Sequence, residues 1–340
     1  MNRIHYIIIG ALALLLLICG FLGLKIFSPL NTDEVLLRVE RGDNAGVIAS
    51  KLSDAGLIRS PRLFRLLAKI TGADRKLKAG VYKFGGKINL LRTVQRLQGG
   101  HSHSLSLTIP EGLSLYAVLH KISKSGLADY DSLAAVANDP VVIKRLTGMD
   151  LPSLEGFLYP ETYRIELGTS PEDILKIQTT EFFKILTSAG IKAQADSSFY
   201  SKLILASIVE SESMYEDERV TVAGVYYNRL ADGMKLEACP TVDYVLEQQG
   251  IHREVLSLAD IAIDSPYNTY VNPGLPPTPI CNPSISSIQA AYAPQKHDYF
   301  FFQADRKGRN VFSRTYREHL QKMADLPSRV EKTLTKNTGK

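Results

Sequence analysis

The chain has 340 residues, which is long enough for two or three domains of ordinary size. Hydrophobic residues make up 45% of it and charged residues 22%, a composition typical of globular proteins and not of disordered chains. The formal net charge is only +5, and no block of Lys or Arg occurs. This argues against a nucleic-acid-binding protein.

The first feature in chain order is an uncharged apolar run, YIIIGALALLLLICGFLGL, at residues 6–24. A helix of this length spans roughly the 30 Å hydrocarbon core of a bilayer. The alternative is a cleaved signal peptide, whose apolar region is normally shorter and ends in a small-x-small site that is missing here. We therefore expect an uncleaved single-pass anchor over 6–27 in the cytoplasmic (inner) membrane. Residues 1–5 would be cytoplasmic, and the C-terminal body would be periplasmic or otherwise extracytoplasmic.

Three cysteines are present: Cys19, Cys239 and Cys281. In an oxidising compartment the last two could pair, but two free, partly buried thiols fit the sequence as well. The histidines are scattered, and neither CxxC nor HExxH occurs. We therefore expect no metal site and no cofactor.

An internal repeat follows the apolar run. Residues 36–58 align without gaps on residues 106–128, and identical residues include the glycine pairs Gly42/Gly112 and Gly56/Gly126. Each copy predicts a short strand, a glycine turn, an amphipathic helix and a glycine at the helix end. The unit loosely resembles LysM-like sugar-binding modules, and two chance strand–helix units of common composition are the alternative.

Other elements are predicted from local signals. We expect a strand at 78–84 and a helix at 89–100 between the two copies, and helices at 170–186, 198–213 and 216–233 after them. A long ordered loop should cover 264–284, and a hairpin 298–313. The expected fold class is α+β: an N-terminal transmembrane helix, a LysM-like βα module and a mixed α/β catalytic domain with a carboxylate-bearing helix.

That helix carries the sequence LILASIVESE at 203–212 and ends in Glu210 and Glu212. A carboxyl group in an apolar environment keeps its proton more readily, which suits general acid catalysis. Alternatively, both acids lie just beyond the buried part, in solvent. The two are about 200° apart on a helix, and both adjoin apolar residues, so periodicity does not choose between them.

Four segments of the second half combine polar and rigid residues: 154–163, 207–212, 228–244 and 267–283. Gathered around one cleft, they would supply the carboxylates, amides, hydroxyls and aromatic rings typical of a saccharide groove. Each segment taken alone also fits an ordinary structural role. The candidate site residues are Glu155, Tyr159, Glu161, Thr162, Glu210, Glu212, Asn228, Thr241, Asn268 and Tyr270.

The motifs LEGFLYPETY, ILASIVESE, GVYYNRLADGMKLEACPTVDY and PYNTYVNPGLPPTPICNPS occur in this order. Together with the TIPEG repeat and the N-terminal apolar run, they resemble the YceG-like family of endolytic murein transglycosylases. The resemblance implies a lytic enzyme that cleaves the MurNAc–GlcNAc bond of peptidoglycan and leaves 1,6-anhydro ends. It implies that Glu210 is the acid/base and Glu212 a supporting residue. The family usually has Asp where this chain has Cys239, which puts the role of that position in doubt.

The resemblance also implies peptidoglycan strands as substrate, termination of strand elongation, and association with glycan-polymerising synthases. Two other functions stay open: a non-catalytic peptidoglycan-binding scaffold, and a hydrolytic muramidase with Glu155 or Glu161 as second carboxylate. The expected organisation is a cytoplasmic tail at 1–5, an anchor at 6–27, a linker at 28–34, a LysM-like module at 35–105, a catalytic domain at 106–325 and a polar tail at 326–340.

Overall fold

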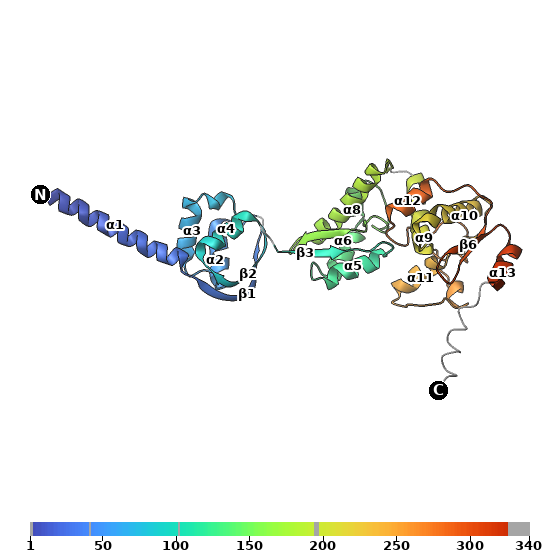
Figure 1. Cartoon of the computed structure of the whole chain (residues 1–340), viewed down its shortest axis with the longest axis horizontal. Coiled ribbons are helices and arrows are strands. Elements are labelled where there is room, and N and C mark those ends of the chain that lie inside the picture. Colours follow the sequence, from blue (N-terminus) through green and yellow to red (C-terminus); the bar gives the residue numbers. More distant parts are fainter. Residues whose placement is uncertain (1–2, 41, 101–102, 194–196, 326–340) are drawn as a thin grey trace, which may run out of the picture. The chain divides into compact units, whose positions relative to one another are not determined.

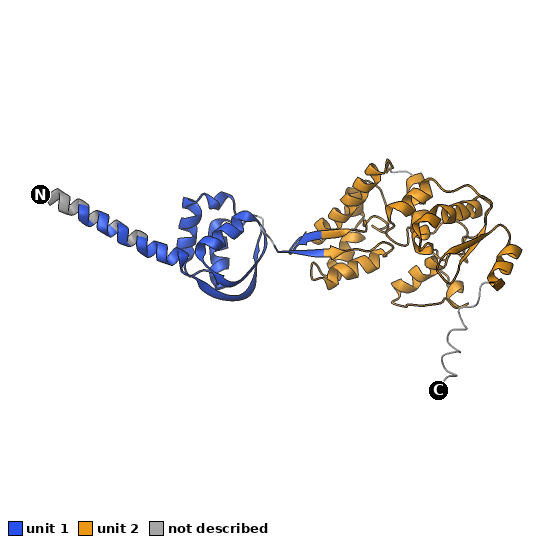
Figure 2. Ribbon diagram, in the orientation of Figure 1, with its two compact units in different colours: residues 1–106, 164–169 blue, residues 107–163, 170–340 orange. Residues whose placement is uncertain are grey.

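The computed structural model describes residues 3–40, 42–100, 103–193 and 197–325, apart from several side chains of the first helix and that of residue 197. Within these ranges the chain forms helices and small two-stranded sheets, which confirms the α+β class (Figure 1). It separates into two compact units (Figure 2). The predicted polar tail, 326–340, lies outside the described residues.

The first unit comprises residues 1–106 and 164–169. Strand β1 pairs with β2 in antiparallel register, and the buried faces of the helices complete a core around Ile48, Phe64 and Tyr82. Its elements are α1 (Arg3–Phe27), β1 (Leu30–Val39), α2 (Ala45–Asp54), α3 (Pro61–Ile70), η1 (Ala73–Arg75), β2 (Gly80–Ile88) and α4 (Leu90–Gly99).

Helix α1 covers the predicted anchor, 6–27. Counting only the residues that the structure describes, no helix is both long and apolar enough to cross a membrane. The prediction of a membrane-spanning segment therefore rests on the sequence alone.

Strand β1 corrects one expectation, because it begins at Leu30, inside the segment 28–34 that the sequence predicts as a linker. Leu30 pairs with Ile88, and the register shifts between Thr32 and Val35. The polar residues of this segment suggest a linker, but β2 supplies the hydrogen-bonding partners that make it a strand. The strand predicted at 78–84 and the helix predicted at 89–100 are both present.

The two copies of the repeat fold alike. Helix α2 and helix α5 (Leu115–Lys124) have the same length, and each begins after a residue whose side chain caps the helix, Asn44 or Ser114. Gly56 and Gly126 follow the two helices with φ of +67° and +79°, in the left-handed region that glycine tolerates best. The sequence repeat is therefore also a repeat of local structure.

The second unit comprises residues 107–163 and 170–340. From residue 104 onward the elements are β3 (Ser104–Thr108), α5, α6 (Tyr130–Ala137), α7 (Pro140–Thr147), β4 (Thr162–Glu166), α8 (Pro171–Ser188), α9 (Ser197–Glu212), η2 (Glu216–Glu218), α10 (Arg219–Ala231), α11 (Cys239–Gln248), η3 (Asp260–Ala262), α12 (Ile285–Tyr292), β5 (Phe301–Ala304), β6 (Asn310–Ser313) and α13 (Tyr316–Asp325).

Helix α9 forms the centre of this unit and contacts α10, α11 and α12. Every residue from Leu203 to Val209 is at most 5% exposed. A helix that is apolar on all sides is buried on all sides. This is why helical periodicity could not indicate which of its two terminal carboxylates faces a cleft.

The other predictions for this unit are confirmed with one shift. Helix α8 starts after the capping residue Ser170, and β5 and β6 form the predicted antiparallel hairpin. The loop at 264–284 contains no helix or strand. The helix predicted at 216–233 begins only at Arg219, because the acidic residues before it form the 3-10 turn η2.

Candidate active site

The carboxylate of Glu210 lies where three helices of the second unit meet. Glu210 is in the last turn of α9, Arg219 is the first residue of α10, and Ser284 caps the N-terminus of α12. Nη2 of Arg219 donates to Oε1 of Glu210 at 3.0 Å, while the amide and hydroxyl of Ser284 donate to Oε2 at 2.9 and 2.6 Å. The Glu210 side chain is only 5% exposed.

These contacts give Glu210 polar partners, whereas its sequence context predicts apolar surroundings. A guanidinium, a backbone N–H at a helix N-terminus and a hydroxyl each donate a hydrogen bond to its carboxyl group. Arg219 is itself oriented by hydrogen bonds from Nη1 to the hydroxyls of Ser284 and Ser286. The result is a charged, nearly dry cluster that holds Glu210 in one orientation.

A second carboxylate, from the loop before α5, contacts the same guanidinium. Oε2 of Glu111 lies 3.8 Å from Nη2 of Arg219, and the Glu111 side chain is 51% exposed. Desolvation and, after it, the charge of Glu210 raise the pKa of Glu111.

Sequence reasoning missed Glu111, Arg219 and Ser284. One signal was present for Glu111: the first copy of the repeat has Arg41 at the corresponding position, so the turn itself does not require an acid. For Arg219 and Ser284 no local signal exists, because each acquires its role only through the packing of α10 and α12 on α9.

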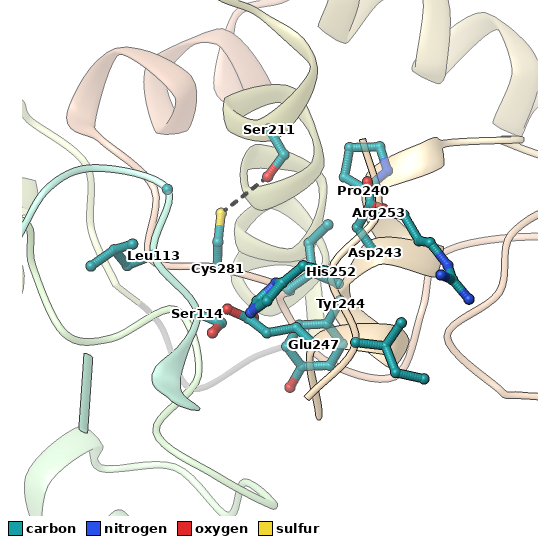
Figure 3. Close-up of a pocket in the computed structure, with 13 residues that line it drawn as sticks. Leu113, Ser114, Ser211, Pro240, Asp243, Tyr244, Glu247, His252, Arg253 and Cys281 are labelled. Carbon is teal, nitrogen blue, oxygen red and sulfur yellow. Dashed lines mark hydrogen bonds between the residues drawn. The ribbon is translucent and has the colours of Figure 1, made fainter. Parts of the chain in front are cut away.

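A hollow of about 280 Å³ opens beside this cluster. Gly112 and Ser211, the sequence neighbours of the two carboxylates, contribute to its lining. Figure 3 shows Leu113 and Ser114 on one side of the hollow and residues of α11 on the other, with Ser211 and Cys281 between them. The lining is polar and open to solvent. The lining residues from α11 onward are Pro240, Asp243, Tyr244, Glu247, Ile251, His252, Arg253, Ile280 and Cys281.

Glu212 lies in a separate cluster at the end of α9. The hydroxyl of Tyr226 donates to Oε1 of Glu212 at 3.1 Å, and burial raises the pKa of Glu212 to about 7. Its charge contributes to the raised pKa of the Cys239 thiol, whose main cause is burial. Sγ of Cys239 lies 3.0 Å from the hydroxyl of Tyr270. The two cysteines of this unit, Cys239 and Cys281, are free.

Glu155 is buried away from this arrangement. It is 1% exposed, and Oε1 accepts a hydrogen bond from the backbone of Leu115 at 2.8 Å. Burial raises the pKa of Glu155 to about 8. It contributes to a second hollow, together with Tyr116, Tyr130 and Tyr244.

The side chains of three predicted binding residues donate hydrogen bonds to backbone carbonyls of the protein. The side-chain amide of Asn228 donates to the carbonyls of His297 and Tyr299, and that of Asn268 donates to carbonyls at 261 and 263. Thr241 is fully buried and donates to the carbonyl of residue 238. Their hydrogen bonds hold loops in place.

The remaining candidates come from the 154–163 segment. Tyr159 is half-buried, and the charges of Glu111 and Glu210 contribute to its raised pKa after desolvation. Glu161 and Thr162 are exposed, and Glu161 accepts a hydrogen bond from the backbone of Thr162. In the described part of the chain, no group of three or more His, Cys, Asp or Glu side chains is placed to hold a metal ion.

Comparisons with known proteins agree over most of the chain. A model of the YceG-like family matches residues 37–325. An endolytic murein transglycosylase of Bacillus subtilis is 32% identical over 319 residues, which is 87% of each protein.

Two further similarities extend this result. An endolytic murein transglycosylase of Streptococcus pneumoniae is 29% identical over 86% of this chain, which spans 58% of that longer protein. Among solved structures, a yceG-like protein of Listeria monocytogenes shares 30% identity with a TM-score of 0.55. That match covers 86% of this chain and 99% of the other.

Proposed function

Because the chain belongs to the YceG-like family, we propose that it is an endolytic murein transglycosylase, the activity for which its curated relatives are named. The structural observation that carries the proposal is the Glu210 carboxylate, fixed by Arg219 and Ser284 beside an open polar hollow. Its substrate would be the glycan strand of peptidoglycan.

The reaction would break the bond between MurNAc C1 and the oxygen of the following GlcNAc. The 6-hydroxyl of the same MurNAc attacks C1, and a 1,6-anhydro ring closes without water. One proton must reach the leaving oxygen, and one must leave the attacking hydroxyl. Glu210 would be the catalytic carboxylate, because its side chain is rigidly held and borders the lining residues of the hollow.

The structure gives reasons to prefer this proposal to the two alternatives. A scaffold that only grips glycan has no need for a buried ion pair, whose desolvation costs several kcal/mol per ion. The muramidase expected from the sequence would use Glu155 or Glu161 as its second carboxylate, and both are otherwise engaged. Glu155 is buried against the Leu115 amide, and Glu161 accepts from the backbone of Thr162.

Mass analysis of the products tests the function. Purified protein is incubated with peptidoglycan, and the soluble fragments are compared with those of Glu210→Gln. We expect the wild type to release fragments lighter by one water than hydrolytic ones, and the variant to bind glycan without releasing any. Reducing-end fragments from the wild type, or full activity of the variant, would sink the proposal.

We also propose membrane attachment through residues 6–27, with the rest of the chain outside the cytoplasm. The uncharged run at 6–24 supports it, and the absence of charge there is what a bilayer core requires. Fractionation of cells producing the full chain and a chain lacking 1–27 checks it: only the full chain should stay with the membrane after alkaline washing.

Two finer proposals concern partners. Residues 35–105 would form a LysM-like glycan-binding module, for which the loose sequence resemblance is the support. Association with peptidoglycan synthases, and a role in ending strand elongation, follow from the family resemblance alone. Co-purification of a synthase with the full chain tests the association, and binding of insoluble peptidoglycan by the full chain and by a chain lacking 35–105 tests the module.

A further inference from the structure

We propose that the second hollow, to which Tyr116, Tyr130 and Tyr244 contribute, binds a sugar ring of the glycan strand away from the bond that is cleaved. The inference rests on the proposed function, because it extends the substrate groove of that enzyme beyond the Glu210 cluster. Three observations carry it: the continuity of the two hollows, the tyrosine rings around the second, and the near absence of charge from its described lining.

The two hollows share their walls. One wall is the segment that enters α5: residues 112–114 line the first hollow, and residues 115, 116 and 119 line the second. The other wall is α11, whose Tyr244 lines both hollows. A polymer that follows these walls out of the first hollow, in the direction of α5, therefore enters the second.

The end of the long loop at 264–284 is also common to both hollows. Residues 280–281 line the first hollow, and Thr278 lines the second. Two backbone hydrogen bonds hold this stretch against the wall before α5. The amide of Gly112 donates to the carbonyl of Asn282 at 3.0 Å, and the amide of Asn282 donates to the carbonyl of Leu113 at 2.8 Å. The groove is thus built from segments that are bonded to one another.

Two pairs of tyrosine rings flank the second hollow. Tyr116 of α5 and Tyr130 of α6 pack edge to face, with ring centroids 6.0 Å apart. The rings of Tyr244 and Tyr267 have centroids 4.9 Å apart, and the Tyr267 hydroxyl lies 2.9 Å from that of Thr278. All four rings are partly exposed, so packing orients them while part of their surface stays free. Such rings offer an apolar face to the C–H groups of a sugar and a polar edge to its hydroxyls.

The rest of the described lining favours a neutral ligand rich in hydroxyl groups. Asn138, Ser153 and Gln248 add amide and hydroxyl groups, and Glu155 is the only acidic or basic residue in this lining. Its Oε2 is buried without a hydrogen-bond partner of normal geometry, which a sugar hydroxyl would supply. The carboxylates of a stem peptide would meet no Lys or Arg in this lining. The hollow therefore suits a sugar better than a peptide.

A longer groove also agrees with cleavage inside a strand. An endolytic enzyme, as the relatives are named, acts where sugars continue on both sides of the bond. The first hollow measures only about 280 Å³, near the lower end of about 300 Å³ for sites that hold one small ligand. The second hollow has the same volume and continues along the shared walls. Binding free energy gained there is available only to strands long enough to reach it.

Strand length separates this subsite from the catalytic centre. The full chain is assayed on glycan oligomers of increasing length from which the stem peptides have been removed. For the wild type, kcat/KM should rise in a step once the oligomer reaches the second hollow. Tyr116→Leu should remove this step by raising KM for long strands roughly 10-fold or more. It should leave kcat and the activity on short oligomers unchanged, because only remote binding is lost.

Two variants control this result. Tyr116→Phe keeps the aromatic ring and should retain most of the length dependence, whereas Leu keeps only the apolar bulk. Tyr316→Leu removes a tyrosine of α13 that is 60% exposed and lines neither hollow, and it should behave as the wild type. Thermal unfolding verifies that each variant is folded.

Binding without turnover is a second readout. In the Glu210→Gln chain, which we expect to bind glycan without cleaving it, adding Tyr116→Leu should weaken the affinity for long strands. The expected loss is roughly 10-fold, which corresponds to about 1.4 kcal/mol. The affinity for short oligomers should not change, and strands that still carry stem peptides should show the same ratio.

Each outcome decides the matter. An equal loss on short and long oligomers, or no loss on long strands, overturns the inference and leaves the proposed function intact. A loss seen only with strands that carry stem peptides assigns the hollow to the peptide and also overturns it. Release of reducing ends by the wild type defeats the proposed function separately, and binding by the Glu210→Gln chains then still decides whether glycan occupies the second hollow.

Discussion

Glu210 and Arg219 form an ion pair at 3.0 Å in which both side chains are nearly covered, at 5% and 6% exposure. The pair joins the end of α9 to the start of α10. Nε of Arg219 is buried without a hydrogen-bond partner among the described residues, so the cluster is not fully satisfied. Taking two charges out of water is costly, so each side chain depends on the other to offset the loss of hydration.

Replacing Arg219 should therefore be severe for the fold as well as for activity. Arg219→Met leaves the buried Glu210 carboxylate without its cation, and removing one partner of a buried pair typically costs about 3–5 kcal/mol. Arg219→Lys keeps the charge but cannot reach Glu210, Ser284 and Ser286 together. The free energy of unfolding, measured in urea at neutral pH, should be highest for the wild type, lower for Arg219→Lys and lowest for Arg219→Met.

The double variant Glu210→Gln, Arg219→Met is the control for this ranking. It removes both charges, so its loss of unfolding free energy should be smaller than the sum of the two single losses. Additive losses would show that the two side chains do not interact energetically.

Glu155 predicts a dependence of stability on pH. Burial raises its pKa to about 8 in the folded chain, above the value of about 4.3 expected when unfolded. The folded state thus prefers the protonated form of Glu155. The stabilisation that this preference adds to the free energy of unfolding is fully present below about pH 4 and is lost as the pH rises to about 8. In that window the unfolding free energy should fall by up to about 1.4 kcal/mol per pH unit through this residue.

Glu155→Gln isolates the effect. The amide oxygen can still accept from the Leu115 backbone, which Glu155 contacts at 2.8 Å, while no ionisation remains. Unfolding measured between pH 5 and 8 should be flatter for this variant than for the wild type. Glu212, with a pKa raised to about 7, should leave a smaller residual slope. An unchanged slope would contradict the role given to Glu155.

Local features of the fold were predictable because neighbouring residues encode them. Ser170 caps α8, and the glycines at 56 and 126 end two equivalent helices. The hairpin β5–β6 follows from two short apolar stretches around a turn. By contrast, the start of β1 reads as a linker in the sequence, because its partner β2 lies about fifty residues away along the chain.

The candidate site was predictable only in part, for the same reason. The apolar run before Glu210 marks an unusual acid, but its partners Arg219, Ser284 and Glu111 come from three other elements. The sequence pattern also predicted substrate binding for polar residues that the structure shows to be buried. Asn268 is fully buried and bonds to backbone groups, since a buried amide must be satisfied wherever it lies.

Thiol labelling should distinguish the two cysteines of the second unit. Cys239 is exposed, whereas Cys281 is 2% exposed and burial raises its pKa well above the usual value. The thiolate is the reactive form, so an alkylating reagent at neutral pH should modify Cys239 first and Cys281 only on unfolding. Although Cys239 is exposed at the surface, desolvation by the atoms around its sulfur raises its pKa, so its labelling should be slower than that of a cysteine in an unfolded peptide.

Cys239→Ser is the control for labelling, because the hydroxyl can keep the contact with Tyr270 that Sγ makes at 3.0 Å. This variant should show no fast labelling and unchanged stability. Peptide mapping by mass spectrometry identifies the modified residue. Modification of Cys281 before Cys239 in the native protein would contradict the burial that the structure gives.

The repeat supplies a prediction that needs no active site. Gly56 and Gly126 end equivalent helices with φ of +67° and +79°, and a methyl group added at either would meet no atom within 4 Å. The cost of Ala there is therefore conformational, about 1–2 kcal/mol at each site. Asn tolerates this conformation better, so Gly56→Asn and Gly126→Asn should each be more stable than the Ala variant at the same site. If the Ala and Asn variants lost the same stability in thermal unfolding, backbone conformation would not set the cost. If the losses differed between positions 56 and 126, the two copies of the repeat would not be energetically equivalent.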